Sequence, residues 1–182
     1  MNLVNSSLIL LAAFVAVYLE AYFNGVRHLF GAQIGLLPPL MVYAGLSTDL
    51  VTLALLAVLG GLWVDSLSAN PLGVSMLPLL LIGLAIYRKR GLILREQTFA
   101  QAVLGLCASA AAPAMTLALL LSIGENPLLG WGSLWQWVVM SLGGAMLTPV
   151  CFRLIDMFNR ALSYRPRGET SFRLDREIKR GR

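Results

Sequence analysis

The sequence has little charge and few of the side chains that bind metals or carry out redox chemistry. Of its 182 residues, 13% are charged, two are cysteine and one is histidine. Soluble domains usually carry about 25% charged residues, and a water-soluble fold of this size cannot bury a chain that is 58% hydrophobic. These shortages exclude a separate soluble catalytic domain and predict a polytopic membrane protein.

The residues most often used in catalysis or metal binding are also isolated from one another. Cys107 and Cys151 lie in apolar runs without CxxC spacing or a neighbouring histidine, so we expect both to be small buried packing residues. His28 has no second histidine with which to share a metal. Gly60-Gly61 lacks the Gly-Lys-Ser/Thr sequence of a phosphate loop. We therefore expect no enzymatic activity, no metal site and no cofactor.

Six apolar segments have the character of membrane-spanning helices, which need about 20 apolar residues, or fewer where neighbours shelter them. The segments are 8–23, 34–46, 50–64, 72–87, 99–123 and 134–155. They predict an all-α fold in which residues 1–163 form a transmembrane helical domain. Residues 164–182 are polar and basic, which predicts a disordered cytoplasmic tail.

The number of spans depends on the polar residues Ser47-Thr48-Asp49: a turn there gives six spans, and a helix that continues through them gives five. In that alternative one helix runs over residues 40–63, and Asp49 lies near mid-membrane at a cost of about 2.5–3.5 kcal/mol. In a turn, Asp49 instead caps the next helix by accepting hydrogen bonds from its backbone N–H groups. We therefore favour six spans, with both termini cytoplasmic.

Positive charge is concentrated in two places and gives a net charge of +5. One is the tail, and the other is a basic cluster after the fourth segment, formed by Arg88, Lys89, Arg90 and Arg95. In a membrane protein such clusters mark the cytoplasmic side, and they can also bind anionic lipid or an acidic partner. Nucleic-acid binding is not expected.

The last two segments carry small residues at helical spacing. One face of the fifth segment holds Gly105, Ala108, Ser109 and Ala112, and one face of the sixth holds Ser141, Gly144, Ala145 and Thr148. Small residues let helices approach closely where the surrounding lipid is as apolar as leucine, so we expect both faces to be packing surfaces. The alternative is a gated transport path kinked at Pro113 and Pro149.

A single acidic residue, Glu20, lies near the outer end of the first segment. It precedes Arg27 by seven residues, which predicts an interfacial ion pair or snorkelling to the surface. A proton relay needs further ionisable groups at depth, and none is evident in the sequence.

The stretch WVDSLSANPLG, residues 63–73, interrupts two apolar segments on the side away from the basic cluster. Asn70-Pro71 has the composition of a helix start, with Asn as N-cap and Pro in the first turn. Asp65, Ser66 and Ser68 can bond the backbone groups left open where the preceding helix ends. We therefore expect a cap-turn-cap hairpin at the outer surface.

The same stretch resembles the rod shape-determining protein MreD family. That family pairs a glycine-bearing span ending in Asp with a short turn and a Leu-Gly start to the next span, matched here by Gly60, Gly61, Asp65, Pro71, Leu72 and Gly73. Three further features resemble the family: the Leu37-Pro38 pair before the second span, the basic cluster after the fourth span, and a last span that carries Trp135 and Pro149. The resemblance covers about Leu36 to Arg160. The turn at 47–49 departs from it by lacking basic residues.

The resemblance implies a non-enzymatic integral membrane subunit of the bacterial cell-elongation machinery, which builds lateral peptidoglycan. It implies a multi-pass protein of the bacterial cytoplasmic (inner) membrane that pairs with the bitopic protein MreC. It also implies association, direct or indirect, with cytoplasmic MreB filaments and cell-wall synthases. The mechanism is then assembly, in which the basic cluster meets the cytoplasmic side. We expect the partner to be held by exposed helix faces together with the outer hairpin, residues Gly60, Gly61, Asp65, Ser66, Ser68, Asn70, Pro71, Leu72 and Gly73.

A second hypothesis belongs to another class: the substrate-binding (S) subunit of an energy-coupling-factor vitamin transporter. Such subunits are also small, apolar and roughly six-span. A vitamin pocket needs aromatic and polar residues that converge from loops and from the last spans. Glu125, Asn126 and Trp131 are the candidates for that role in this chain.

Overall fold

A computed structural model describes residues 3–22, 34–68, 71–93, 97–124 and 130–162. Over these residues the chain is helical and contains no strand, so the predicted all-α fold is confirmed. The helices are α1 (Leu3–Tyr22), α3 (Leu37–Ser47), α4 (Leu50–Leu67), α5 (Met76–Lys89), the 3-10 turn η1 (Arg90–Leu92), α6 (Thr98–Ile123) and α7 (Trp131–Leu162).

Three helices, α4, α6 and α7, are long and apolar enough to cross a membrane. Within the apolar 18-residue stretch of α6, only 17% of the residues are buried inside the protein. Large apolar side chains such as Leu121, Leu142 and Met146 are exposed on α6 and α7. Apolar surface on this scale is typical of a protein that lies in lipid. The chain is therefore a helical membrane protein, whereas six separate crossings and cytoplasmic termini stay predictions.

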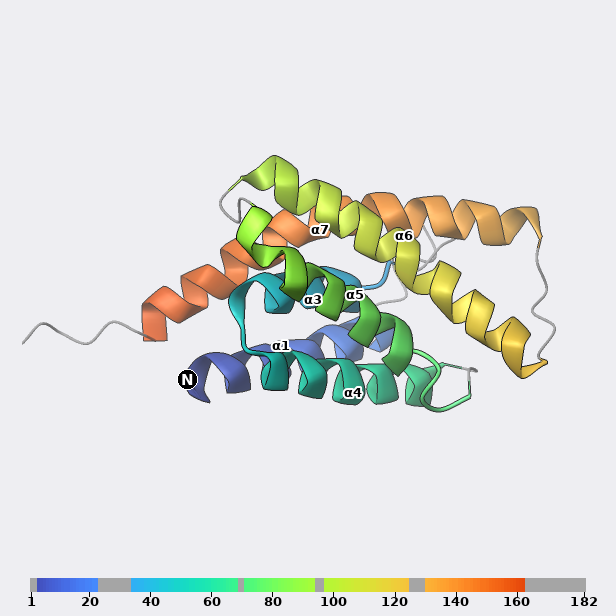
Figure 1. Ribbon diagram of the computed structural model, residues 1–182, viewed down its shortest axis with the longest axis horizontal. Coiled ribbons are helices and arrows are strands. Elements are labelled where there is room, and N and C mark those ends of the chain that lie inside the picture. The colour runs from blue at the N-terminus through green and yellow to red at the C-terminus, as the bar shows by residue number, and fades with distance from the viewer. Residues whose placement is uncertain (1–2, 23–33, 69–70, 94–96, 125–129, 163–182) are drawn as a thin grey trace, which may run out of the picture.

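The helices form a bundle with two distinct ends. α6 and α7 lie along one side, α1 and α4 lie along the opposite side, and α3 and α5 lie between them (Figure 1). Consecutive helices from α3 to α7 run in opposite directions, and the start of α1 lies at the same end as the end of α7 (Figure 1). We call this the basic end, because Arg88 and Lys89 close α5 there.

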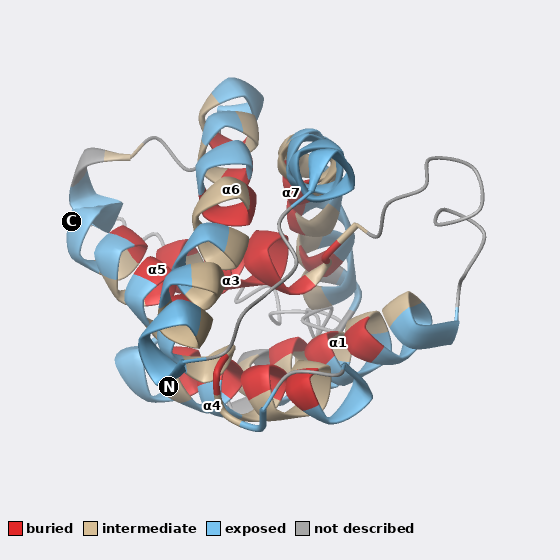
Figure 2. Ribbon diagram, turned by 90° about the vertical axis from the view of Figure 1, so that its right-hand side faces the viewer, coloured by how far each residue is buried: buried red, intermediate tan, exposed pale blue. Residues whose placement is uncertain are grey.

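The centre of the bundle is α3, which contacts all five of the other α-helices described. Residues 37–46 of α3 are buried (Figure 2). With 11 residues, α3 is about 16 Å long, roughly half the thickness of the hydrocarbon core. A helix that is apolar on every face is stable only when it is surrounded, and the longer helices supply that shelter.

The predicted break between the second and third segments is confirmed. α3 ends at Ser47, Thr48 closes it by donating both its N–H and its hydroxyl to the carbonyl of Ala44, and α4 begins at Leu50. One continuous helix over residues 40–63 is therefore wrong. Asp49 occupies the N-cap position with extended backbone, but the expected side-chain cap bond is absent. Its side chain is exposed, so only the charge–dipole attraction remains.

The structure differs from the prediction that both cysteines are buried packing residues. Cys107 is exposed, because it lies on the face of α6 opposite the buried Gly105 and Ser109. Cys151 is half-buried on α7.

α6 and α7 continue as helices through Pro113 and Pro149. Beside the first of these prolines, the indole of Trp137 donates to the carbonyl of Ala110 at 2.8 Å.

Candidate functional site

The side chain of Asp65 joins the end of α4 to the following turn. It is 1% exposed, although it belongs to the last turn of its helix. Oδ2 accepts the backbone N–H groups of Gly73 at 2.8 Å and Ser75 at 3.1 Å, and Oδ1 accepts the hydroxyl of Ser75. Bonds to a carboxylate are about twice as strong as neutral ones. This carboxylate therefore holds residues 71–75 against the end of α4, in an arrangement we call the Asp65 turn.

The predicted helix start at Asn70-Pro71 is wrong. α5 begins at Met76, and residues 71–75 form a turn that contains Gly73 at a φ of +95°. That left-handed conformation favours glycine and cannot continue a right-handed helix. Ser75 occupies the N-cap position of α5, but its hydroxyl donates to Asp65 instead of capping the helix. Asn70 lies outside the described residues.

The two serines after Asp65 bond backbone carbonyls near the end of α4, as the sequence predicts. The hydroxyl of Ser66 donates to the carbonyl of Trp63 at 2.8 Å. Ser68 directs its N–H to the carbonyl of Asp65 at 3.2 Å and its hydroxyl to the same atom at 3.4 Å. Both serines are exposed, as are Pro71 and Leu72, so the outer rim of the turn is accessible while its carboxylate is buried.

Gly60 and Gly61 let α4 approach its neighbours, but the two contacts differ in kind. A Cβ atom on Gly61 would lie 2.8 Å from both the Cα and the N of Met76, which are backbone atoms at the start of α5. A Cβ atom on Gly60 would lie 2.6 Å from a terminal methyl group of Leu37 on α3. A side-chain methyl can rotate away, whereas backbone can move only with its helix.

We expect Gly61→Ala to destabilise the protein by about 1–3 kcal/mol, the usual range for overpacking a tight contact. Gly60→Ala is expected to change stability by no more than about 1 kcal/mol, because alanine favours the helix and Leu37 can adjust. The measurement is the midpoint of thermal unfolding of each variant in the same detergent. Equal losses from the two substitutions would contradict the distinction between backbone and side-chain contacts.

The basic cluster lies at the opposite end of α5 from the Asp65 turn. Arg88 and Lys89 are exposed in the last turn of α5, where a cation interacts favourably with the helix dipole. Arg90 stacks over the ring of Tyr87 at 4.3 Å, and its guanidinium donates to the carbonyl of Thr48 at 3.4 Å. Arg95 lies outside the described residues. The cluster therefore does not share a site with Asp65.

A buried polar contact at the basic end was not predicted from the sequence. Tyr43 of α3 is 1% exposed; its hydroxyl donates to Oδ1 of Asp156 at 3.1 Å and accepts from Nδ2 of Asn159 at 3.3 Å. Its ring also meets Phe152 edge-on, with centroids 4.9 Å apart. The sequence held two signals for this contact. Tyr43 is the only residue of the apolar second segment with a polar group on its side chain, and Asp156 and Asn159 are the only Asp and Asn near the end of the last segment.

The small-residue faces of α6 and α7 pack against each other, which confirms their predicted role as packing surfaces. A Cβ atom on Gly105 would collide with the hydroxyl of Thr148 and lie 2.6 Å from the carbonyl oxygen of Gly144. A Cβ atom on Gly144 would collide with the side chain of Ser109. We call this contact the small-residue seam; α6 and α7 form the most extensive helix pair in the described bundle.

An open cavity of about 290 Å³ lies at the end of the bundle that carries the Asp65 turn. Its lining is mostly apolar and includes residues of α1, α3, α4, α5, α6 and α7. Glu20 of α1 lines it and accepts the backbone N–H of Leu36 at 3.2 Å, which ties the end of α1 to the start of α3. Arg27, the partner expected for Glu20, lies outside the described residues.

No three His, Cys, Asp or Glu side chains in the described part of the chain lie close enough together to hold a metal ion. Comparisons of this chain with protein-family models, with curated proteins and with solved structures gave no match. Its function is therefore inferred from the arrangement of its own residues, above all from the Asp65 turn and the surfaces around it.

Proposed function

We propose that this chain is a non-enzymatic membrane subunit of the bacterial cell-elongation machinery, of the MreD type. It pairs with an MreC-like bitopic protein in the cytoplasmic membrane and links cytoplasmic MreB filaments to the cell-wall synthases. Its contribution is assembly: it presents fixed surfaces at the two ends of a membrane-embedded bundle.

The observation that carries this proposal is the Asp65 turn. The stretch on which the family resemblance rests, residues 60–73, is also the stretch in which a buried carboxylate fixes the link between two helices. Gly61 packs directly on the backbone at the start of α5, so the turn and the helix pair form one rigid unit. A rigid rim with exposed Leu67 and Leu72 suits a binding surface better than a catalytic centre.

The separation of the two ends supports the same proposal. Arg88, Lys89 and Arg90 lie at one end of α5, and Ser75 and the Asp65 turn lie at the other. Basic residues favour the cytoplasmic side of a membrane. A subunit arranged in this way meets acidic lipid or cytoplasmic partners at its basic end and leaves the Asp65 turn for a partner on the other side.

The transporter alternative receives less support from the residues that the sequence suggested for its pocket. Trp131 is 86% exposed and does not line the cavity described above. Glu125 and Asn126 lie outside the described residues. The cavity itself is small and mostly apolar, near the lower end of about 300–1,000 Å³ that is usual for ligand pockets.

Identification of the native partners tests the proposal. The protein is tagged at its C-terminal tail, extracted in mild detergent from its own cells, and the co-purifying proteins are identified by mass spectrometry. We expect a bitopic MreC-like protein together with cell-wall synthases. Recovery of two ABC-type ATPases and a large membrane coupling subunit would replace the proposal with the transporter function.

A further inference from the structure

The basic cluster continues a stripe of apolar side chains on the outer face of α5. The exposed residues of this stripe are spaced four, four and three apart: Leu77, Leu81, Ala85 and Arg88. Residues three and four apart share one face of a helix. Lys89, which is also exposed, follows Ala85 by four residues. The charges at the end of α5 therefore lie directly on a surface that is otherwise apolar.

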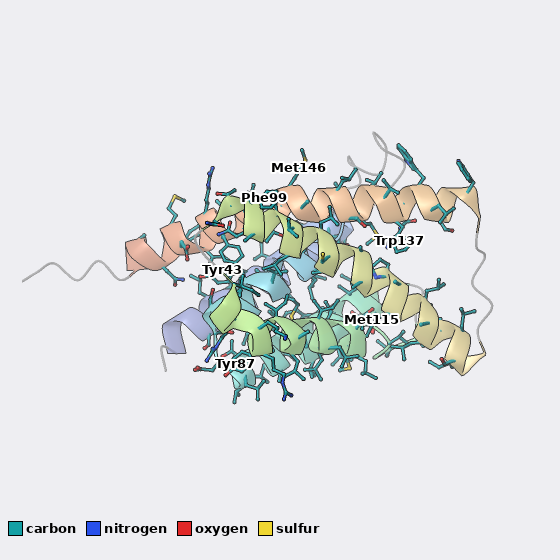
Figure 3. The ribbon with its side chains drawn as sticks, turned by 45° about the horizontal axis from the view of Figure 1, so that its top comes forward. Tyr43, Tyr87, Phe99, Met115, Trp137 and Met146 are labelled. Atoms are coloured by element: carbon teal, nitrogen blue, oxygen red, sulfur yellow. The ribbon has the colours of Figure 1, made fainter. Side chains whose placement is uncertain are left out.

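The two helices beside α5 extend this apolar surface. α5 lies between α6 and α4 (Figure 1) and contacts both. α4 begins at the basic end with Leu50 and Val51, which are exposed, and α6 begins there beside Phe99, which is 79% exposed. Figure 3 shows Tyr87 and Phe99 toward the same end of the bundle, away from Trp137. Large apolar side chains are thus exposed right up to the basic end.

Two contacts hold Arg90 at the level where α4 begins. Its guanidinium stacks on Tyr87 at 4.3 Å and donates to the carbonyl of Thr48 at 3.4 Å. A guanidinium has five N–H donors, and Arg90 makes no other hydrogen bond within the part of the chain that the structure describes. Most of its donors are therefore available on a side chain that is already ordered, which lowers the entropic cost of binding.

The other two cations have no partner among the described residues. Neither Arg88 nor Lys89 makes a hydrogen bond or an ion pair there, and the exposed carboxylate of Asp49, next to Thr48, makes none with them. Three cations therefore lie without a paired counter-charge at the edge of an apolar surface. In a membrane protein this edge is the level of the lipid headgroups, which charged side chains reach from the ends of helices.

The surroundings of the cluster favour a lipid over an acidic protein. A soluble partner would approach through water, where exposed Leu50, Val51 and Phe99 beside the cations are unfavourable. A phospholipid suits both parts of the surface, because its acyl chains pack against apolar side chains and its phosphate accepts charge-assisted hydrogen bonds from Arg and Lys. The excess of positive charge selects an anionic headgroup.

We infer that Arg88, Lys89 and Arg90 bind the phosphate of an anionic phospholipid whose acyl chains lie along the exposed stripe of α5. This inference rests on the proposed function only in placing the lipid in the cytoplasmic leaflet. The binding itself requires only that the basic end lie at a membrane surface. Arg90 supplies the fixed part of the site, and the other two cations add charge on the lipid-facing side of α5.

A lipid titration with a charge-matched control tests the site. Binding of dioleoylphosphatidylglycerol or dioleoylphosphatidylcholine to the full-length protein in detergent is measured by native mass spectrometry. The test variant carries Arg88→Gln, Lys89→Gln and Arg90→Gln. The control, which also loses two arginines and one lysine, carries Arg176→Gln, Lys179→Gln and Arg180→Gln in the tail. We expect the test variant to bind phosphatidylglycerol about a hundredfold more weakly, about fivefold for each charge, with the control unchanged.

Arg90→Lys distinguishes a shaped site from diffuse attraction. Lysine keeps the positive charge but lacks the planar guanidinium that stacks on Tyr87 and presents paired donors. We expect this variant to bind phosphatidylglycerol about two- to fivefold more weakly, as loss of an exposed cation–π contact would. An unchanged affinity would overturn the site, because attraction to charge alone does not distinguish lysine from arginine.

The remaining outcomes separate this inference from the proposed function. Equal weakening by the cluster and tail variants, or displacement of the lipid by an equal concentration of inorganic phosphate, would overturn the site. So would a cluster variant that retains its lipid but loses a co-purifying protein. A cluster variant that loses the lipid and still co-purifies with the MreC-like protein supports the site and keeps the proposed function. Absence of that protein from the unmodified preparation removes the proposed function and leaves the lipid result standing.

Discussion

Asp65→Ala is expected to lower the free energy of unfolding by about 3 kcal/mol, because the substitution leaves three donors without an acceptor and each such donor costs about 1–3 kcal/mol when buried. The donors are the N–H groups of Gly73 and Ser75 and the hydroxyl of Ser75. The measurement is the thermal midpoint in detergent, together with the amount of protein in the membrane. We expect both to fall.

Asp65→Asn is the matched control, because it separates hydrogen bonding from charge. The amide oxygen can replace Oδ2 and accept both N–H groups, and the amide nitrogen can replace Oδ1 and donate to the hydroxyl of Ser75. We therefore expect Asn to retain most of the stability, with a loss of about 1 kcal/mol. Ser66→Ala, which removes one exposed bond to the carbonyl of Trp63, is expected to change stability by less than about 0.5 kcal/mol.

The same variants show whether the Asp65 turn serves partner binding. If the turn acts by its shape, Asp65→Asn retains the co-purifying bitopic protein and Asp65→Ala loses it in proportion to the loss of folded protein. If Asp65→Ala left both the protein level and the partner unchanged, the role assigned to the turn would be wrong. Equal damage from Asn and Ala would show instead that the negative charge itself is required.

Gly105→Ala is expected to have the second large effect, a loss of about 3 kcal/mol, at the upper end of overpacking costs. The new methyl group would collide with the hydroxyl of Thr148 and press on the backbone of Gly144. Thr148 is fully buried and cannot rotate into open space. α6 and α7 must therefore move apart, which removes contacts along the whole small-residue seam. Gly144→Ala is expected to do the same through Ser109.

Gly132→Ala is the control for this pair, because it makes the same chemical change on α7 where nothing lies within 4 Å of the new methyl group. Alanine favours a helix over glycine by about 1 kcal/mol, so Gly132→Ala is expected to be neutral or slightly stabilising. The three variants are compared by thermal midpoint under identical conditions. A Gly105→Ala protein as stable as Gly132→Ala would mean that the helices do not approach at Gly105.

Several local features were predictable because they depend on residues near one another in the sequence. The break at Thr48-Asp49 follows from polar residues between two apolar segments. The two packing faces follow from small residues three and four apart on each helix. Ser66 and Ser68 bond carbonyls within their own helix end, which sequence spacing also predicts. In each case the residues that carry the signal lie within about one or two helical turns of one another.

The features that the sequence did not reveal depend on contacts across the turn between two helices, on partners far along the chain, or on the orientation of a helix face. Asn70-Pro71 has the composition of a helix start, but Asp65 binds the amides of Gly73 and Ser75 and delays α5 to Met76. The pairing of Tyr43 with Asp156 spans 113 residues and follows from no local spacing. Cys107 lies in an apolar run, yet the helix face on which it falls is exposed.

The sequence by itself determined that this chain is helical and belongs in a membrane, because composition and apolar run length fix those properties without reference to partners. It also determined which helix faces are small enough for close contact. Only the tertiary structure decided which faces meet, that short α3 lies at the centre, and that the carboxylate of Asp65 is buried. Those outcomes depend on how the six α-helices that the structure describes share the available apolar surface, a competition among distant segments that no local pattern encodes.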